Sequence, residues 1–141
     1  MVESKWHKKA RLDEINYYKK AGYVVESSHE DKKIVMFRDK PSRSTFLSDA
    51  DIVVINDNNI VKIIEVQQTY RPKEIIGIIK ATDICNKCKI DNKIYSLSNI
   101  ELTIILKKEK QKSKKPIQMQ LIKDILKLDG CLCSFNFKEV V

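Results

Sequence analysis

The chain has 141 residues, of which 43% are hydrophobic and 33% charged, and its formal net charge is +8. This apolar content suffices for a packed core, so the composition excludes wholesale disorder and favours a single domain over residues 1–141. No run of about 18 apolar residues occurs, so we expect no membrane-spanning helix. The N-terminus is charged at once, at Glu3 and Lys5, unlike a secretory signal, and this predicts a cytoplasmic protein.

The first half of the chain predicts one helix followed by four strands. Residues 4–21 carry an approximate apolar stripe at helical spacing, and Gly22 is a natural stop. A polar, basic loop is expected at 40–48. Asp57, Asn58 and Asn59 predict a tight turn, because these residue types tolerate left-handed conformations. The expected strands cover residues 23–27, 33–38, 51–55 and 60–67.

The second half predicts helix, strand, helix and strand. Residues 71–84 should be helical, with Pro72 in the first turn, and 99–106 should be a strand. A lysine-rich loop or arm at 107–116 then leads to an amphipathic helix at 117–128 and, after Gly130, a strand at 131–137. The residues expected to point into the core from these helices are Ile75, Ile76, Ile79, Leu121, Ile122, Ile125 and Leu126.

This order predicts an α/β domain around one mixed β-sheet flanked by helices. The core would run α-β-β-β-α-β over about residues 4–106, with a C-terminal helix and strand appended over 107–141.

Acidic residues stand at the ends of two strands that otherwise consist of core residues. A three-residue turn at Asp57–Asn59 pairs Asp51 with Glu65 and Asp49 with Gln67 across an antiparallel hairpin. Directly opposite side chains share a face, with Cβ atoms about 4.5–5.5 Å apart. A slip by one residue would separate the acids. The same face should continue as core through Val53, Ile55, Val61 and Ile63.

Two neighbouring carboxylates backed by an apolar core repel each other unless a cation joins them. A hard divalent ion such as Mg²⁺ (or Mn²⁺) takes oxygen ligands, can polarise a phosphate and lowers the pKa of an attacking water. Asp51, Glu65 and the carbonyl of Val66 are the candidate metal ligands. The alternative is that the acids merely cap strand ends in water.

The words "ADIVVI" and "IIEVQ" on this hairpin resemble the signature of the PD-(D/E)XK, or restriction-endonuclease-like, superfamily. The resemblance implies a restriction-endonuclease-like fold, with Asp51 and Glu65 as metal ligands and Gln67 in the place of the family's lysine. A glutamine can hydrogen-bond the attacking water but brings no positive charge, so this departure puts part of the transition-state stabilisation in doubt.

A narrower similarity joins "KWHKKAR", "VVE", "ADIVVI" and "EVQQT" to the nuclease domain of CoiA-like competence proteins. It implies that His7 and Glu26 complete the site, and it also matches Thr69. His7 could then assist proton transfer; the alternative is a helix histidine with no role. Archaeal Holliday-junction resolvases of the same superfamily carry a glutamate in the first helix, and Glu14, on the same helix face as His7, is the candidate for that place.

The basic residues predict contacts to a nucleic-acid backbone, which would be salt-dependent and tolerant of sequence. An ordinary solvated surface is the alternative for each of them. The candidates near the proposed site are Lys40, Arg43, Lys62, Arg71 and Lys73.

Four cysteines form one C-x-x-C word, Cys85 and Cys88, and one C-x-C word, Cys131 and Cys133. Four thiolates could hold a structural Zn²⁺ if the two words meet in space. The leading alternative is four buried free cysteines; disulfides and Fe–S ligation are further alternatives.

Together these features predict a Mg²⁺-dependent DNA endonuclease, structure-selective or nonspecific, whose catalytic candidates are Asp51, Glu65, Gln67, His7, Glu14 and Glu26. A homodimer is expected if both strands of a duplex are cut. The alternatives are a noncatalytic nucleic-acid-binding protein on the same fold, favoured by Gln67, a Holliday-junction resolvase or RNA-directed nuclease, and a structural module.

Overall fold

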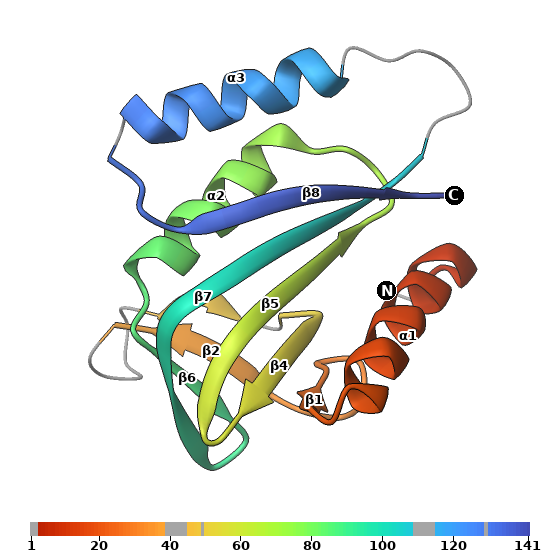
Figure 1. Cartoon of the computed structure of the whole chain (residues 1–141), viewed down its shortest axis with the longest axis vertical. Helices are drawn as coiled ribbons and strands as arrows, with labels where there is room; N and C mark the ends of the chain where they lie inside the picture. The colour runs from red at the N-terminus through yellow and green to blue at the C-terminus, as the bar shows by residue number, and fades with distance from the viewer. Residues whose placement is uncertain (1–2, 39–44, 49, 109–114, 129) are drawn as a thin grey trace.

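The computed structural model describes residues 3–38, 45–48, 50–108, 115–128 and 130–141. These residues form an α/β protein with three helices and one eight-stranded mixed sheet (Figure 1). The elements are α1 (Lys5–Lys20), β1 (Val24–Glu26), β2 (Ile34–Phe37), β3 (Thr45–Ser48), β4 (Ile52–Asn56), β5 (Asn59–Gln67), α2 (Pro72–Ile84), β6 (Lys87–Ile90), β7 (Lys93–Lys107), α3 (Lys115–Leu128) and β8 (Ser134–Val140).

The sheet has the order β1-β4-β5-β7-β6-β2-β3, with β8 also paired to β7. β1, β4 and β5 are successively antiparallel, whereas β7 runs parallel to β5 after the crossover through α2. The long strand β7 pairs with β6 through its first part and with β8 through its last part. Asn99, whose φ of 54° is left-handed, lies between the two parts. This arrangement leaves β4 between β1 and β5, and β5 between β4 and β7.

Two hydrophobic clusters fill the two faces of the sheet. α1 covers one face, and α2 with α3 covers the other (Figure 1). Ala10 and Ile15 of α1 pack against buried side chains of β4 and β5, while Ile75 and Ile79 of α2 are completely buried on the opposite face. Both helices therefore owe their position to an apolar stripe, as their sequences predict.

The helix boundaries follow from local chemistry. Ser4 caps α1, since its hydroxyl accepts a hydrogen bond from the His7 backbone N–H at 3.1 Å. Gly22, with a φ of 94°, turns the chain after α1. Pro72 occupies the first turn of α2. The predicted helices at 4–21, 71–84 and 117–128 are confirmed within a few residues.

The β4–β5 hairpin has the predicted register at its open end but reaches it by a different route. Ile52 pairs with Ile64, and Val53 with Ile63. The turn is two residues rather than three: Asp57 and Asn58 have φ values of 49° and 66°, and β5 already begins at the next residue. Such turns favour Asn and Asp because both positions are left-handed.

A β-bulge at Val61 compensates for the shorter turn. The register shifts by one residue between the pairs Ile55–Ile60 and Val54–Lys62, so Val61 is the extra residue on β5. Val61 therefore packs on the α1 face, and Ile60 takes its place in the α2 cluster. The prediction that Val61 shares a face with Val53 was wrong for this reason.

Three other predictions were wrong. The loop expected at 40–48 contains strand β3, and strand β6 and the first part of β7 were not foreseen. The alternation of lysines with Cys88 and Ile90 in β6 is a strand pattern, so that signal was available. The last strand begins at Ser134, three residues after the predicted start. Leu121 and Ile125 are 57% and 39% exposed, since only the side of α3 that carries Ile122 and Leu126 is covered. None of the described helices is long and apolar enough to span a membrane.

Candidate functional site

An open groove of about 500 Å³ lies at the end of the β4–β5 hairpin opposite its turn. The start of α1, the loop after β1 and the start of α2 form its walls. The described residues that line it are Glu3, Ser4, His7, His29, Asp51, Glu65, Val66, Gln67, Gln68, Thr69, Arg71, Glu74 and Ile78.

The two predicted acids meet in this groove. Asp51 directly precedes β4, Glu65 lies in β5, and they are only 8% and 9% exposed. One residue beyond Glu65, the backbone N–H of Val66 donates a hydrogen bond of 2.8 Å to Oδ2 of Asp51. The hairpin register thus brings both carboxyl groups to one place, with the Asp51 side chain anchored on the neighbouring strand.

Both histidines of the chain approach the same aspartate. Nε2 of His29 lies 2.8 Å from Oδ1 of Asp51, and Nε2 of His7 lies 3.5 Å from Oδ2. His7 belongs to the first turns of α1. His29 lies in the turn after β1, where its backbone N–H donates to the Ser27 hydroxyl at 3.3 Å. Three separate segments therefore converge on one carboxylate.

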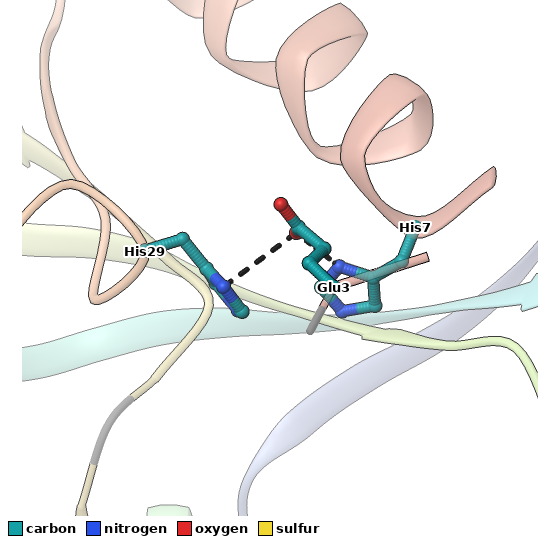
Figure 2. Close-up of side chains that lie close together, drawn as sticks. All are labelled: Glu3, His7 and His29. Atoms are coloured by element: carbon teal, nitrogen blue, oxygen red, sulfur yellow. Dashed lines mark hydrogen bonds and ion pairs between the residues drawn. The ribbon is translucent and has the colours of Figure 1, made fainter. Parts of the chain in front are cut away.

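Glu3 closes the arrangement on the other side of the imidazoles, between the two rings (Figure 2). Its Oε2 contacts Nδ1 of His7 and lies 3.6 Å from Nδ1 of His29. Arg11, one of the few buried charged residues, grips both oxygens of Glu3 through Nε at 2.9 Å and Nη2 at 3.0 Å. Each imidazole consequently has a carboxylate at both of its nitrogens.

Opposite charges shift the pKa of three of these groups. Hydrogen bonding to Arg11 is the main cause that lowers the pKa of Glu3 to about 2, against its burial. A hydrogen bond to Asp51 raises the pKa of His7. Burial acts to raise the pKa of Asp51, but hydrogen bonds from His7, Val66 and His29 outweigh it and hold that pKa below its usual value.

Glu65 differs from Asp51, because it has no cationic partner among the described residues. Burial raises its pKa well above the ordinary value, and the negative charge of Asp51 adds to this effect. The groove lining carries four carboxyl groups (Glu3, Asp51, Glu65, Glu74) and a single arginine, Arg71, which is itself paired with Glu74 at 3.3 Å. Arg11 pairs with Glu3, and both histidines approach Asp51. Glu65 is therefore the carboxyl group without a positive partner among the described residues of this lining, and a bound cation would be stabilising there.

Two other predicted site residues also line the groove. Gln67 contributes an amide whose Oε1 is buried without a hydrogen-bond partner. Arg71, exposed and at the N-cap of α2, lies at the rim. Val66 also lines the groove, and its backbone N–H donates to Asp51; its carbonyl as a metal ligand stays a prediction.

Three further predicted residues, Glu14, Glu26 and Lys73, do not line this groove. Glu14 lies further along α1 and pairs with Lys138 of β8 at 2.6 Å. Glu26 pairs with Lys32 at 3.9 Å, and Lys73 is exposed. Lys40 and Arg43 lie outside the described residues. The family resemblances had implied that Glu14 and Glu26 lie beside the acids. The structure places both of them elsewhere.

Three residues at the groove were missed from the sequence: Glu3, Arg11 and His29. His7 and Arg11 are four residues apart in α1, which places them on one helical face. Glu3 stands four residues before His7, just ahead of the N-cap Ser4, so this signal was available. His29 gave no signal, because it follows a three-residue strand within an irregular turn and only the tertiary fold carries it to Asp51.

The cysteines form no comparable group. Among the described residues, Glu3, His7 and His29 are the one set of three or more candidate ligands that lie close enough to share an ion. All four cysteines are free. Burial raises the pKa of Cys85 to about 11 and is the main cause that raises those of Cys88 and Cys133 to about 12. Cys85 and Cys88 are buried and Cys131 and Cys133 are partly buried, so the expectation of four buried free cysteines holds for two of them.

No protein-family model matches this sequence, and comparisons with curated proteins and with solved structures found no significant match either.

Proposed function

We propose that this protein is a metal-dependent endonuclease that hydrolyses phosphodiester bonds in DNA, acting on structure or without selectivity rather than on a base sequence. The observation that carries the proposal is the meeting of buried Asp51 and Glu65 at the open end of the hairpin, beside Gln67. Side chains of these types in this order are also what the PD-(D/E)XK resemblance implies for a nuclease site.

The order of elements supports the same proposal. α1 precedes the antiparallel strands β1, β4 and β5, and α2 then leads to β7, which is parallel to β5. This is the α-β-β-β-α-β order expected for a restriction-endonuclease-like core, with β2, β3 and β6 as additions to it and α3 and β8 as the C-terminal extension.

The donor chemistry of the groove fits a hard divalent ion. Two carboxyl groups offer oxygen ligands, and one of them, Glu65, is buried without a cation to balance it. A polyanion entering a groove with this many acids would be repelled unless a cation lay between them. When bound, an ion such as Mg²⁺ supplies polarisation of the scissile phosphate and lowers the pKa of a water.

The remaining groups have roles that follow from their chemistry. Asp51 and Glu65 would hold the ion, and the Gln67 amide would orient the attacking water by a hydrogen bond. His7, whose Nε2 lies 3.5 Å from Asp51, would assist proton transfer. Arg71 at the rim would contact a neighbouring phosphate.

The proposal is tested by cleavage of linear duplex, single-stranded and four-way-junction DNA, with Mg²⁺, Mn²⁺ or EDTA. We expect cutting that requires the ion and falls at least about 100-fold in Asp51→Asn and Glu65→Gln. Glu14→Gln, a carboxylate on the neighbouring helix that does not line the groove, is the matched control. Cutting that persists in both site variants would place the activity elsewhere.

A noncatalytic nucleic-acid-binding protein is the second candidate, because Gln67 brings no charge where the resembling family has a lysine. Gln67→Lys distinguishes the two. In an active enzyme the variant should cut somewhat faster than the wild type. If the wild type binds DNA without cutting it, and only Gln67→Lys cuts, the second candidate is correct.

A further inference from the structure

We propose that Glu3, His7 and His29 bind a divalent transition-metal ion, such as Zn²⁺, next to the Asp51–Glu65 pair. Each of the three side chains can offer one ligand atom, and these atoms all lie within 4.8 Å of one another (Figure 2). They come from the segment before α1, from the first turns of α1 and from the turn after β1, so only the folded chain assembles them.

The donor set decides the class of ion. Two imidazole nitrogens with one carboxylate oxygen are ligands for borderline ions such as Zn²⁺, and sets of this kind leave a coordination position open. Mg²⁺ by contrast takes oxygen ligands. This site therefore differs in chemistry from the two-carboxylate site at Asp51 and Glu65, although the two sites share a groove.

The surrounding contacts are those that a histidine-rich metal site needs. The Nδ1 atoms of both histidines face Glu3. The Nε2 atom of His29 lies 2.8 Å from Asp51, and that of His7 lies 3.5 Å from it. Metal-bound histidines usually donate their other ring N–H to a carboxylate, which fixes the ring and its tautomer. Asp51 would serve both rings in this way. Arg11 holds Glu3 through two hydrogen bonds, so the ligand carboxylate is positioned too.

The rest of the groove also favours a cation. Glu65 lines the same groove, is about nine-tenths buried and has no cationic partner among the described residues. Arg71 is the one arginine in the lining, and Glu74 occupies it. The three candidate ligands also line the groove, so water or an oxygen of a substrate can reach the open coordination position.

Binding of the ion at this site can be measured separately from DNA cleavage. The chain has two histidines, and both are in the cluster. Titrating ¹⁵N-labelled, EDTA-treated full-length protein with ZnCl₂ and following the imidazole nitrogens by NMR therefore reports on this site alone. We expect both histidines to respond together at one equivalent, with Nδ1 as the ligated nitrogen. MgCl₂ should give no ligation shift at either Nδ1, because Mg²⁺ takes oxygen ligands.

Substitutions test whether the Glu3 carboxylate is a ligand of the zinc ion. Glu3→Gln should weaken Zn²⁺ binding in calorimetry at least about 10-fold. Glu30→Gln is the matched control, because Glu30 also contacts Arg11, at 3.5 Å, but is not one of the three ligands. The Zn²⁺ affinity of this variant should stay within about twofold of that of the wild type. His29→Asn, with helix content checked by circular dichroism, provides a second variant if Glu3→Gln folds poorly.

Zinc that leaves both imidazole spectra unchanged, as binding to the cysteines would, overturns the proposal, as does the absence of binding at micromolar concentrations. Wild-type protein that binds zinc through the two histidines but cuts none of the DNA substrates would instead contradict the proposed function alone.

Discussion

Nε2 of His29 lies 2.8 Å from Oδ1 of Asp51, although the two residues are 22 positions apart in the chain. His7 approaches the other oxygen of the same carboxylate from α1. Asp51 is therefore the point at which the start of the first helix, the turn after β1 and the central hairpin are tied together. Its neighbour Glu65 has none of these positive partners, so the pKa of Asp51 is lowered while that of Glu65 is raised.

Removing the charge of Arg11 should destabilise the fold. The side chain is 5% exposed and pairs with Glu3, so Arg11→Met leaves a carboxylate without its partner in a largely buried place. We expect a loss of about 3 kcal/mol in the free energy of unfolding, measured by urea denaturation. Lys9→Met on the same helix is the control. Its pair with Asp13 is 78% and 59% exposed, so the loss should be below about 1 kcal/mol. Equal losses in both variants would contradict the buried ion pair.

Glu65→Gln should stabilise the ion-free protein at neutral pH. The pKa of Glu65 is raised above 4.5 in the folded state, so the folded protein holds a proton that the unfolded chain releases. The stability due to this group is complete below pH 4.5 and is lost as the pH rises through the folded pKa.

The measurement is the thermal midpoint between pH 4 and pH 8 in EDTA. The wild type should lose stability with rising pH relative to Glu65→Gln, and the variant should melt at least about 2 °C higher at pH 8. Adding the metal ion should raise the midpoint of the wild type but not that of the variant. Parallel pH profiles of the two proteins would exclude a buried, proton-retaining Glu65.

Glu3 should act in the opposite direction. Its folded pKa is about 2, below the ordinary 4.5, so its contribution is present above pH 4.5 and is lost as the pH falls toward 2. Glu3→Gln should therefore be less stable than the wild type at pH 6, and the gap should narrow at pH 3. Urea denaturation at both pH values checks this. A gap that is independent of pH would mean that the carboxylate charge does not contribute.

The two-residue turn predicts a sharp preference at Asn58. Its φ of 66° is strained for a β-branched side chain, so Asn58→Val should lose about 1–2 kcal/mol of stability. Asn58→Gly should stay within about 1 kcal/mol of the wild type, because glycine adopts this conformation freely. Chemical denaturation measures both variants. If Asn58→Val were harmless, the turn would be of another type.

The cysteines should differ in reactivity. Cys88 is completely buried and its pKa is about 12, whereas Cys131 is only partly buried. Iodoacetamide at pH 8 should therefore label Cys131 in the native protein well before Cys88, because only an accessible thiolate reacts. Mass spectrometry of timed digests gives the order. Labelling of all four at one rate would indicate that the native core opens on the timescale of the reaction.

Periodicity in the sequence determined most of the elements and the position of the two acids. The apolar stripes of α1 and α2, the alternation of Ile100, Leu102, Ile104 and Leu106 in β7, and the polar turn of the hairpin are local signals, and the structure confirms them. Because neighbouring strands of a hairpin pair by simple counting, Asp51 and Glu65 could be placed together without coordinates. Even there, a shorter turn and the bulge at Val61 replaced the predicted turn and cancelled each other.

Only the tertiary structure decided what surrounds those acids. His29 and Glu3 reach Asp51 and the imidazoles across the fold, and Arg11 is buried although its sequence context is that of a solvated helix face. Glu14 and Glu26, which a resemblance of short words had offered, lie elsewhere for the same reason. Side-chain contacts between distant segments depend on how the helix packs against the sheet, and no local pattern of residues encodes that packing.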